Sequence, residues 1–118
     1  MKVANGRLGL TCDQGATFTR RITYKSDGTI VNLTGYTARM QVRPSYAYES
    51  DNIVVNLTSG SGLTITGATG TIDITITAGA TQEITPGSYV YDLEIVAPDT
   101  TVQRLLEGPF IVTPEVTK

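Results

Sequence analysis

A chain of 118 residues is long enough to bury one core and to form one domain. Charged residues make up 17% of it and the formal net charge is −2, so no basic excess indicates nucleic-acid binding. No apolar run approaches the roughly 18–20 residues that cross a membrane. The first ten residues, MKVANGRLGL, lack the apolar core and cleavage site of a signal peptide. We expect a protein that is made in a cytoplasm and binds neither nucleic acid nor membrane.

The residue types that are missing exclude several kinds of chemistry. Without histidine, the chain cannot build a Ser-His or Cys-His nucleophile pair or a zinc site of His and Cys ligands. The single cysteine, Cys12, cannot form an internal disulfide bond, and its neighbours indicate a small hydrophobic side chain rather than a reactive thiol. The fragments SDG and ESDN lack the full spacing of a calcium loop. We therefore expect no enzymatic activity, no catalytic or metal site and no cofactor.

The composition favours β-structure. Threonine occupies twenty positions, many of them alternating with Ile, Val or Leu, and twelve glycines separate these stretches. Residues 16–25 form the first long alternating stretch, in which Arg20 falls among the apolar positions. Arg20 lies either at a bulge or with its stem over apolar surface and its head in water. Residues 26–29 (SDGT) predict a tight turn with a positive φ at Gly28.

The stretch 36–43 predicts a strand with two distinct faces. Its inward side chains are Tyr36, Ala38, Met40 and Val42. Its outward side chains are Thr37, Arg39, Gln41 and Arg43. Pro44 cannot donate to a sheet ladder, so the strand should end before it.

Short alternating segments continue to the end of the chain. Strands are predicted at 52–57, 63–66, 71–77 and 88–96, with a last strand or pair of strands from residue 102. Thr77 caps at most one short helical turn near 78–84. This pattern of seven or eight strands predicts an all-β fold, a single antiparallel β-sandwich of Ig-like or jelly-roll-like type over residues 9–118. Residues 1–8 are predicted to form an N-terminal arm, either free or added as a strand to a partner.

The outward row with Arg39 and Arg43 has a candidate partner row in the strand that carries Asp92 and Glu94. If the two strands are neighbours, opposite charges face each other across the pair. Asp92 and Glu94 lie about 7 Å apart along their strand, which also suits acid–base chemistry, although the strand context favours a solvated face. The arginines are therefore either a charge ladder that sets register or part of a docking surface.

Four residues are candidates for contact with a partner: Arg39, Arg43, Tyr46 and Tyr48. The two tyrosines lie in a polar loop at 45–51, and tyrosine provides large contact area with few rotatable bonds. The same tyrosines, with nearby carboxylates, also fit a carbohydrate-binding site, although the lack of tryptophan makes stacking on a sugar ring less favoured.

Three stretches carry a resemblance to known proteins: LTGYTARMQVR (33–43), YVYDLEI (89–95) and LLEGPFIVTPEVT (105–117). Their order resembles small structural proteins of tailed-bacteriophage virions, and is similar to the N-terminal β-sandwich domain of upper baseplate proteins. The resemblance covers nearly the whole chain, from about Cys12 to Thr117. These stretches are fold signatures without catalytic residues, so the resemblance implies no active site.

The resemblance implies a non-enzymatic structural protein that is made in the bacterial host cytoplasm and located in the virion. We expect an adaptor in the tail, baseplate or collar, with other virion proteins (tail, fibre, collar or capsid) as partners and with homo-oligomers in the particle. Similar domains can be followed by a stalk or fibre, whereas this chain ends at Lys118, which favours an adaptor over a receptor binder. Two alternatives stay open: a capsid decoration, or cement, protein and a carbohydrate-binding β-sandwich module.

Overall fold

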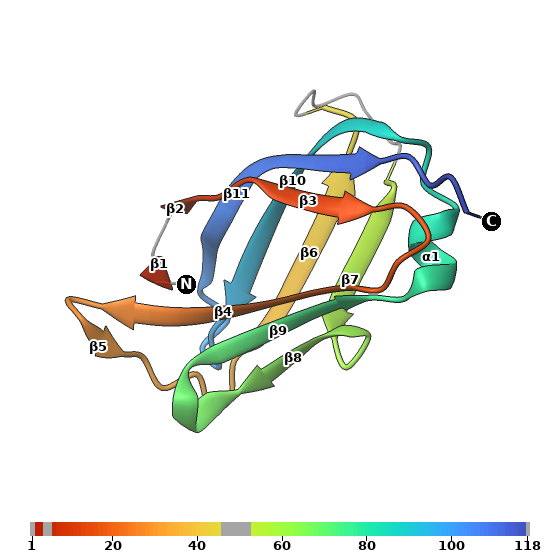
Figure 1. The fold of residues 1–118 in the computed structure, drawn as a ribbon. Coiled ribbons are helices and arrows are strands. Elements are labelled where there is room, and N and C mark those ends of the chain that lie inside the picture. The colour runs from red at the N-terminus through yellow and green to blue at the C-terminus, as the bar shows by residue number, and fades with distance from the viewer. Residues whose placement is uncertain (1, 4–5, 46–52, 118) are drawn as a thin grey trace.

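In the computed structural model, the described residues are 2–3, 6–45 and 53–117. They form eleven strands, one short α-helix and one 3-10 turn (Figure 1), so the all-β prediction is confirmed. The strands are β1 (Lys2–Val3), β2 (Gly6–Arg7), β3 (Leu10–Asp13), β4 (Phe18–Ser26), β5 (Thr29–Ile30), β6 (Thr37–Arg43), β7 (Val55–Ser59), β8 (Gly62–Thr66), β9 (Thr71–Ile76), β10 (Gly87–Val96) and β11 (Val102–Thr113). The helix is α1 (Ala78–Gln82), and the 3-10 turn is η1 (Gly67–Thr69).

The strands follow one continuous path, β1-β4-β9-β8-β7-β6-β10-β11-β2, with β3 also paired to β11 and β5 to β4. This sheet curls, so that β4, β9 and β8 lie in front of β7, β6 and β10 in Figure 1. Among the described residues, the expected count of seven or eight strands was wrong, because eleven strands are present and both halves belong to one sheet. The pairing is also not purely antiparallel, since β7 runs parallel to β8 and β3 to β11. The additional strands are β3, with four residues, and β1, β2 and β5, whose two residues each are too few to leave an alternating pattern.

The two halves share one core. The inward residues of β6, β9 and β10 are buried, as their alternation predicts, except that Tyr89 of β10 is half-buried. Tyr36, which was predicted to point inward just before β6, is also half-buried. Phe18 of β4 and Phe110 of β11 have ring centroids 5.7 Å apart, and Tyr91 of β10 meets Phe110 at 6.4 Å. Arg20 pairs with Ile74 in an unbroken register and is exposed, so its side chain reaches solvent without a bulge.

A bulge occurs instead in β11. The pairing of β11 with β10 shifts between Leu93–Leu106 and Glu94–Arg104, which leaves Leu105 as an extra residue. Both Leu105 and Leu106 are fully buried. A bulge accommodates two consecutive inward residues by inserting one residue into the ladder. It therefore keeps Arg104 beside Glu94.

Several local predictions are confirmed. Thr77 caps α1, because its side chain accepts a hydrogen bond from the Ala80 N–H at 3.3 Å. Gly28 has a φ of 80°, and Asp27 before it also has a positive φ of 52°, as in a type I′ turn. β6 ends at Arg43, directly before Pro44. The turn η1 is an additional helical element that the sequence pattern did not predict.

The N-terminal segment pairs within its own chain. Strand β1 runs parallel to β4, and β2 runs parallel to β11. Of the predicted loop at 45–51, Ser45 alone is described, so Tyr46 and Tyr48 lie outside the described residues.

Candidate functional site

The register of β6 against β10 brings the two polar rows together. Arg39 pairs with Glu94 and Gln41 pairs with Asp92 on the outer face of this antiparallel pair. Arg39 Nε lies 2.7 Å from Glu94 Oε1. The prediction that the two rows face each other is confirmed, with Arg39 and Glu94 as its opposite-charge pair, whereas Arg43 lies opposite Val90. A cross-strand ion pair of this kind contributes about 0.2–1 kcal/mol and helps to fix register.

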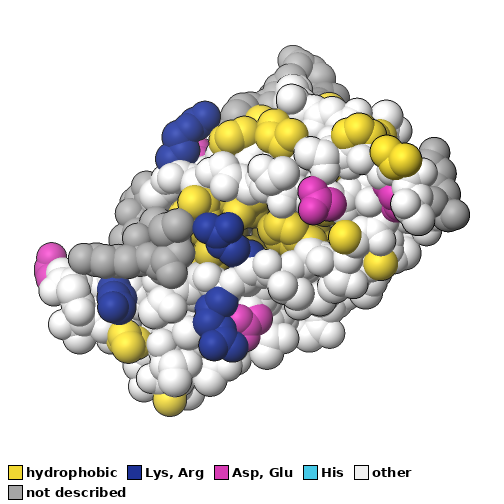
Figure 2. Space-filling view, viewed as in Figure 1, with side chains coloured by type: hydrophobic (Ala, Val, Ile, Leu, Met, Phe, Trp, Pro, Cys, Tyr) yellow, Lys and Arg dark blue, Asp and Glu magenta, His cyan; other side chains and the backbone are white. Residues whose placement is uncertain are grey.

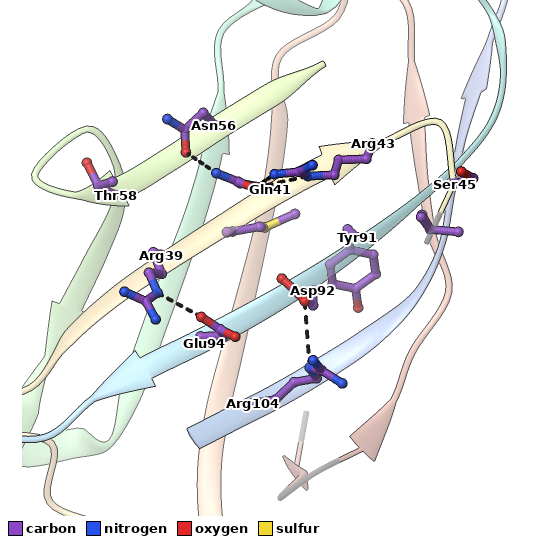
Figure 3. Close-up of a pocket in the computed structure, with 12 residues that line it drawn as sticks. Arg39, Gln41, Arg43, Ser45, Asn56, Thr58, Tyr91, Asp92, Glu94 and Arg104 are labelled. Atoms are coloured by element: carbon purple, nitrogen blue, oxygen red, sulfur yellow. Dashed lines mark hydrogen bonds and ion pairs between the residues drawn. The ribbon is translucent and has the colours of Figure 1, made fainter. Parts of the chain in front are cut away.

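Four adjacent strands, β7, β6, β10 and β11, surround a groove of about 740 Å³, which we call the polar groove (Figure 3). It is lined by Arg39, Met40, Gln41, Arg43, Ser45, Asn56, Thr58, Val90, Tyr91, Asp92, Glu94 and Arg104. Most of these residues carry guanidinium, amide, hydroxyl or carboxylate groups. The polar groove therefore offers both hydrogen-bond donors and acceptors to a ligand.

Two rows of side chains cross this face from strand to strand. The first row is Thr58, Arg39, Glu94 and Arg104, and the second row is Asn56, Gln41, Asp92 and Glu107. In the first row the charges alternate, so each arginine has a carboxylate as its neighbour. In the second row two carboxylates are direct neighbours. This arrangement concentrates negative charge where β10 meets β11.

Amide side chains position Arg43 at the edge of the polar groove. Gln41 Oε1 accepts hydrogen bonds from Arg43 Nε at 3.1 Å and from Arg43 Nη2 at 2.8 Å. Gln41 Nε2 donates to Asn56 Oδ1 at 3.4 Å. The amide of Gln41 thus links β6 to β7 and holds the guanidinium of Arg43 beside the groove, as Figure 3 shows.

Asp92 has a longer ion-pair contact than Glu94, the other carboxylate that lines the groove. Its Oδ2 lies 3.6 Å from Arg104 Nε, too far for a hydrogen bond, and Arg104 Nη1 lies 3.4 Å from Glu107 Oε1. Burial is the main factor that raises the pKa of the Asp92 carboxyl. The charges of Glu94 and Glu107 raise this pKa further, while Arg104 and Arg43 lower it. Asp92 would therefore gain from an additional hydrogen-bond donor.

Three features of the described residues bear on metal, thiol and membrane chemistry. No group of three or more His, Cys, Asp or Glu in this part of the chain is placed to hold a metal ion. Cys12 is fully buried, and burial followed by the charge of Asp13 raises the pKa of its thiol, which disfavours a reactive thiolate. In the described ranges, no helix has the length and apolar character needed to cross a bilayer.

The structure places two of the four predicted contact residues in the polar groove. Arg39 and Arg43 both line it, and so does Ser45, the last described residue before the tyrosine loop. The roles of Tyr46 and Tyr48 stay a prediction, because they lie outside the described residues.

Sequence reasoning missed Arg104, which links both carboxylates of the second row. The sequence feature that could have identified Arg104 is the adjacent pair Leu105–Leu106, because two consecutive inward residues in a strand require a bulge. With that extra residue counted, Arg104 aligns with Glu94. Asn56 was missed because alternation within a strand does not report which strand lies beside it.

Comparison with known proteins supplies a fold neighbour. No protein-family model and no curated protein sequence matches this chain. A crystal structure of the PmoD soluble domain from Methylocystis sp. ATCC 49242 (Rockwell) is similar, with a TM-score of 0.51 and 6% sequence identity. The similarity covers 87% of this chain and 77% of that chain. At this identity the similarity concerns the fold alone.

Proposed function

We propose that this chain is a non-enzymatic structural protein of a bacteriophage particle that acts as an adaptor in the tail, baseplate or collar through protein–protein contacts. The observation that carries the proposal concerns the three stretches that resemble upper baseplate domains. They contain β6, most of β10 and most of β11, which are consecutive neighbours in the sheet. The resemblance therefore traces one contiguous part of the fold, the part whose outer face bears the polar groove.

The polar groove is the proposed docking surface for a neighbouring virion protein. Arg39 and Arg43 line it, and the sequence continues from Ser45 directly into Tyr46 and Tyr48, so all four candidate contact residues belong to one region of the chain. A partner that donates a hydrogen bond to the carboxylate of Asp92, or places a positive charge beside it, would stabilise that carboxylate. Complementary charges of this kind contribute mainly to specificity and association rate.

A β-sandwich fold is part of the same proposal. We interpret the curled sheet as a variant of a β-sandwich, in which the two faces pack against each other although their strands form one path. The contact between Phe18 and Phe110 supports this interpretation, because it joins β4 to β11 across the core.

Purified particles of the phage that encodes the chain test the proposal. We expect quantitative mass spectrometry to find the chain at a fixed copy number per particle, and cryo-electron microscopy to locate it in the tail. Location on the capsid would support the alternative of a decoration protein instead. Absence of the chain from purified particles would contradict both roles.

A charge reversal in the polar groove tests the docking surface itself. Asp92→Lys should reduce incorporation into particles, because it removes the acceptor and adds a positive charge. The matched control is Asp73→Lys on β9, which also reverses an aspartate on an outer face. Equal incorporation of both variants would contradict docking through the groove.

A carbohydrate-binding module is the second candidate, and the polar lining of the groove favours it. Amide, guanidinium and carboxylate groups are suited to hydrogen bonds with sugar hydroxyls. A glycan array separates the two candidates. Binding that is lost in a Tyr46→Ala, Tyr48→Ala double variant would support the module, and an array without hits would remove it.

A further inference from the structure

The outer face of β10 and β11 carries apolar side chains on both sides of the two polar rows. Val90 pairs with Pro109 on one side of these rows, and Val96 pairs with Val102 on the other side. Val102 is 49% exposed, and the other three are half-buried. In the described strands β4, β9 and β8, by contrast, none of the outward positions is apolar. Outward apolar pairs beside a groove are suited to contact with another protein.

The second polar row has a particular order across β7, β6, β10 and β11. It reads amide, amide, carboxylate, carboxylate, from Asn56 and Gln41 to Asp92 and Glu107. The amide donors therefore lie on β7 and β6, and the carboxylate acceptors lie on β10 and β11. Within the chain this order is unfavourable, because the two carboxylates are direct neighbours and repel each other.

A two-fold axis that runs along the strands, between β6 and β10, exchanges the two halves of this row. If a second copy packs face to face on this axis, its β10 lies over β6 and its β11 lies over β7. Gln41 then faces Asp92 of the second copy, and Asn56 faces Glu107 of the second copy. The Gln41 amide has two N–H donors, so it can donate to this carboxylate as well as to Asn56 Oδ1. The strands of the two copies are then roughly aligned, as they are in most sheet-on-sheet contacts.

The same axis also pairs the first polar row. Arg39 faces Glu94 of the second copy, and Thr58 faces Arg104 of the second copy. Figure 3 shows Arg39 and Glu94 side by side on the two strands that flank the axis. In both rows, no two like charges face each other across the axis. A surface that matches itself after a two-fold rotation is what an isologous contact requires.

We propose that the polar groove is an isologous interface, in which two copies of this chain pack face to face on a two-fold axis between β6 and β10. The contact supplies amide donors to the neighbouring carboxylates Asp92 and Glu107, and it covers the outward apolar pairs. The inference deepens the proposed function by naming a second copy as the partner, and it rests on that function for the use of the groove as a docking surface.

Opposite charge reversals in separate chains test the reciprocal pairing. One chain carries Arg39→Glu and the other carries Glu94→Arg, and native mass spectrometry measures the dimers, with one chain labelled with ¹⁵N. The wild-type chain should form dimers. Each variant alone should dimerise at least about tenfold more weakly, because like charges then face each other across the axis. An equal mixture should recover dimers with one chain of each kind, because both reversed pairs match again.

The matched control is Arg21→Glu on β4. Arg21 Nε lies 2.7 Å from Asp73 Oδ1, the same distance that joins Arg39 Nε to Glu94 Oε1. The control therefore removes an equivalent ion pair within the chain, on the opposite outer face, and should leave the dimer unchanged. Val96→Asp is a second variant, which keeps both ion pairs. It should also weaken the dimer at least about tenfold, because the contact would bury an unpaired charge.

Four results would overturn the inference: a wild-type chain that is monomeric at every concentration, a mixture of the two reversed chains that stays monomeric, a control that dissociates equally, or Val96→Asp dimers as tight as those of the wild type. If the chain is nevertheless found in particles, the proposed function stands and a different protein occupies the groove. Dimers that follow the expected pattern, with no chain in particles, would overturn the proposed function and leave the isologous interface standing.

Discussion

The two outer faces of the curled sheet differ in composition although both alternate in the same way. On β4, β9 and β8 most outward residues are threonines: Thr19, Thr23, Thr64, Thr66, Thr71 and Thr75. We call this surface the threonine face. Its ion pair joins Arg21 Nε to Asp73 Oδ1 at 2.7 Å. Figure 2 shows this side, where a basic and an acidic side chain touch over β4 and β9 among polar, uncharged side chains.

The polar groove on the other half collects arginines, carboxylates and amides on four neighbouring strands. Threonine suits an exposed strand because its branched side chain packs against neighbours on the pleated surface, and it needs no charged partner. Charged side chains need compensation from adjacent strands, and the ion pair of Asp92 is longer than that of Glu94. Alternation within a strand thus identifies an outer face, while the pairing of side chains across neighbouring strands identifies which outer face is suited to binding.

The largest expected effect concerns the core that joins the two faces. Phe110→Ala should lower the free energy of unfolding by about 3–5 kcal/mol, because Phe110 contacts both Phe18 and Tyr91. Denaturant unfolding measures this change, and both halves should unfold in one transition. Two separate transitions, or a loss well below the range, would show that the two faces do not share a core.

The second effect compares charge reversals on the two faces. Arg104→Glu adds a fourth carboxylate beside Asp92, Glu94 and Glu107, and should cost about 1–2 kcal/mol at low salt. Arg21→Glu on the threonine face places a carboxylate beside Asp73 and should lower the free energy of unfolding by at most about 1 kcal/mol. Both losses should shrink at 1 M salt, where the screening length is about 3 Å. Equal losses at low salt would contradict a concentration of negative charge in the groove.

A smaller effect concerns pH. Because the pKa of Asp92 is raised in the folded protein, the folded state binds this proton more tightly than the unfolded state, and stability falls as pH rises through that range. Asp92→Asn removes this penalty, so the variant should gain less than about 1 kcal/mol at pH 7. The gain should disappear below the ordinary aspartate pKa of 3.8.

Thermal unfolding at several pH values measures the difference between the Asp92→Asn variant and the wild type. The matched control, Asp73→Asn, removes the ion pair with Arg21 and should lose stability at pH 7. An Asp92→Asn variant that is less stable than the wild type at pH 7 would mean that Asp92 is already well compensated.

The smallest effect is expected on the threonine face. Thr75→Val replaces an exposed threonine on β9 by a residue of similar shape and strand preference. The free energy of unfolding should change by less than about 0.5 kcal/mol, and incorporation into particles should be unchanged. Loss of incorporation in the Thr75→Val variant would indicate that the docking surface lies on the threonine face and not in the polar groove.

The sequence predicted the long strands because their period-2 patterns are strong. Ile72, Ile74 and Ile76 are buried as expected, and β6 ends at Arg43 as Pro44 requires. The two-residue strands left no period to detect, so the arrangement of β1 on β4 and β2 on β11 was not predicted. The same limit explains the miscounted strands, whereas the single sheet arises from the parallel pairing of β7 with β8, which joins the two halves.

The candidate site was predicted in part. The outward row of residues 36–43 was expected to face Asp92 and Glu94 if the two strands were neighbours, and the structure pairs these strands with Arg39 opposite Glu94. The contributions of Asn56 and Arg104 depend on which strands flank this pair and on the bulge at Leu105. Strand order and bulges arise from long-range pairing, which a pattern within one strand does not encode.

A cryo-electron microscopy map of the particle tests the central claim most directly, because it shows which outer face of the curled sheet meets a neighbouring protein. We expect the polar groove over β6, β10 and β11 to be covered in the assembled copies, with a donor group of the neighbour at Asp92, and the threonine face to be turned to solvent. A map in which the groove is open in every copy while the threonine face is buried would contradict it.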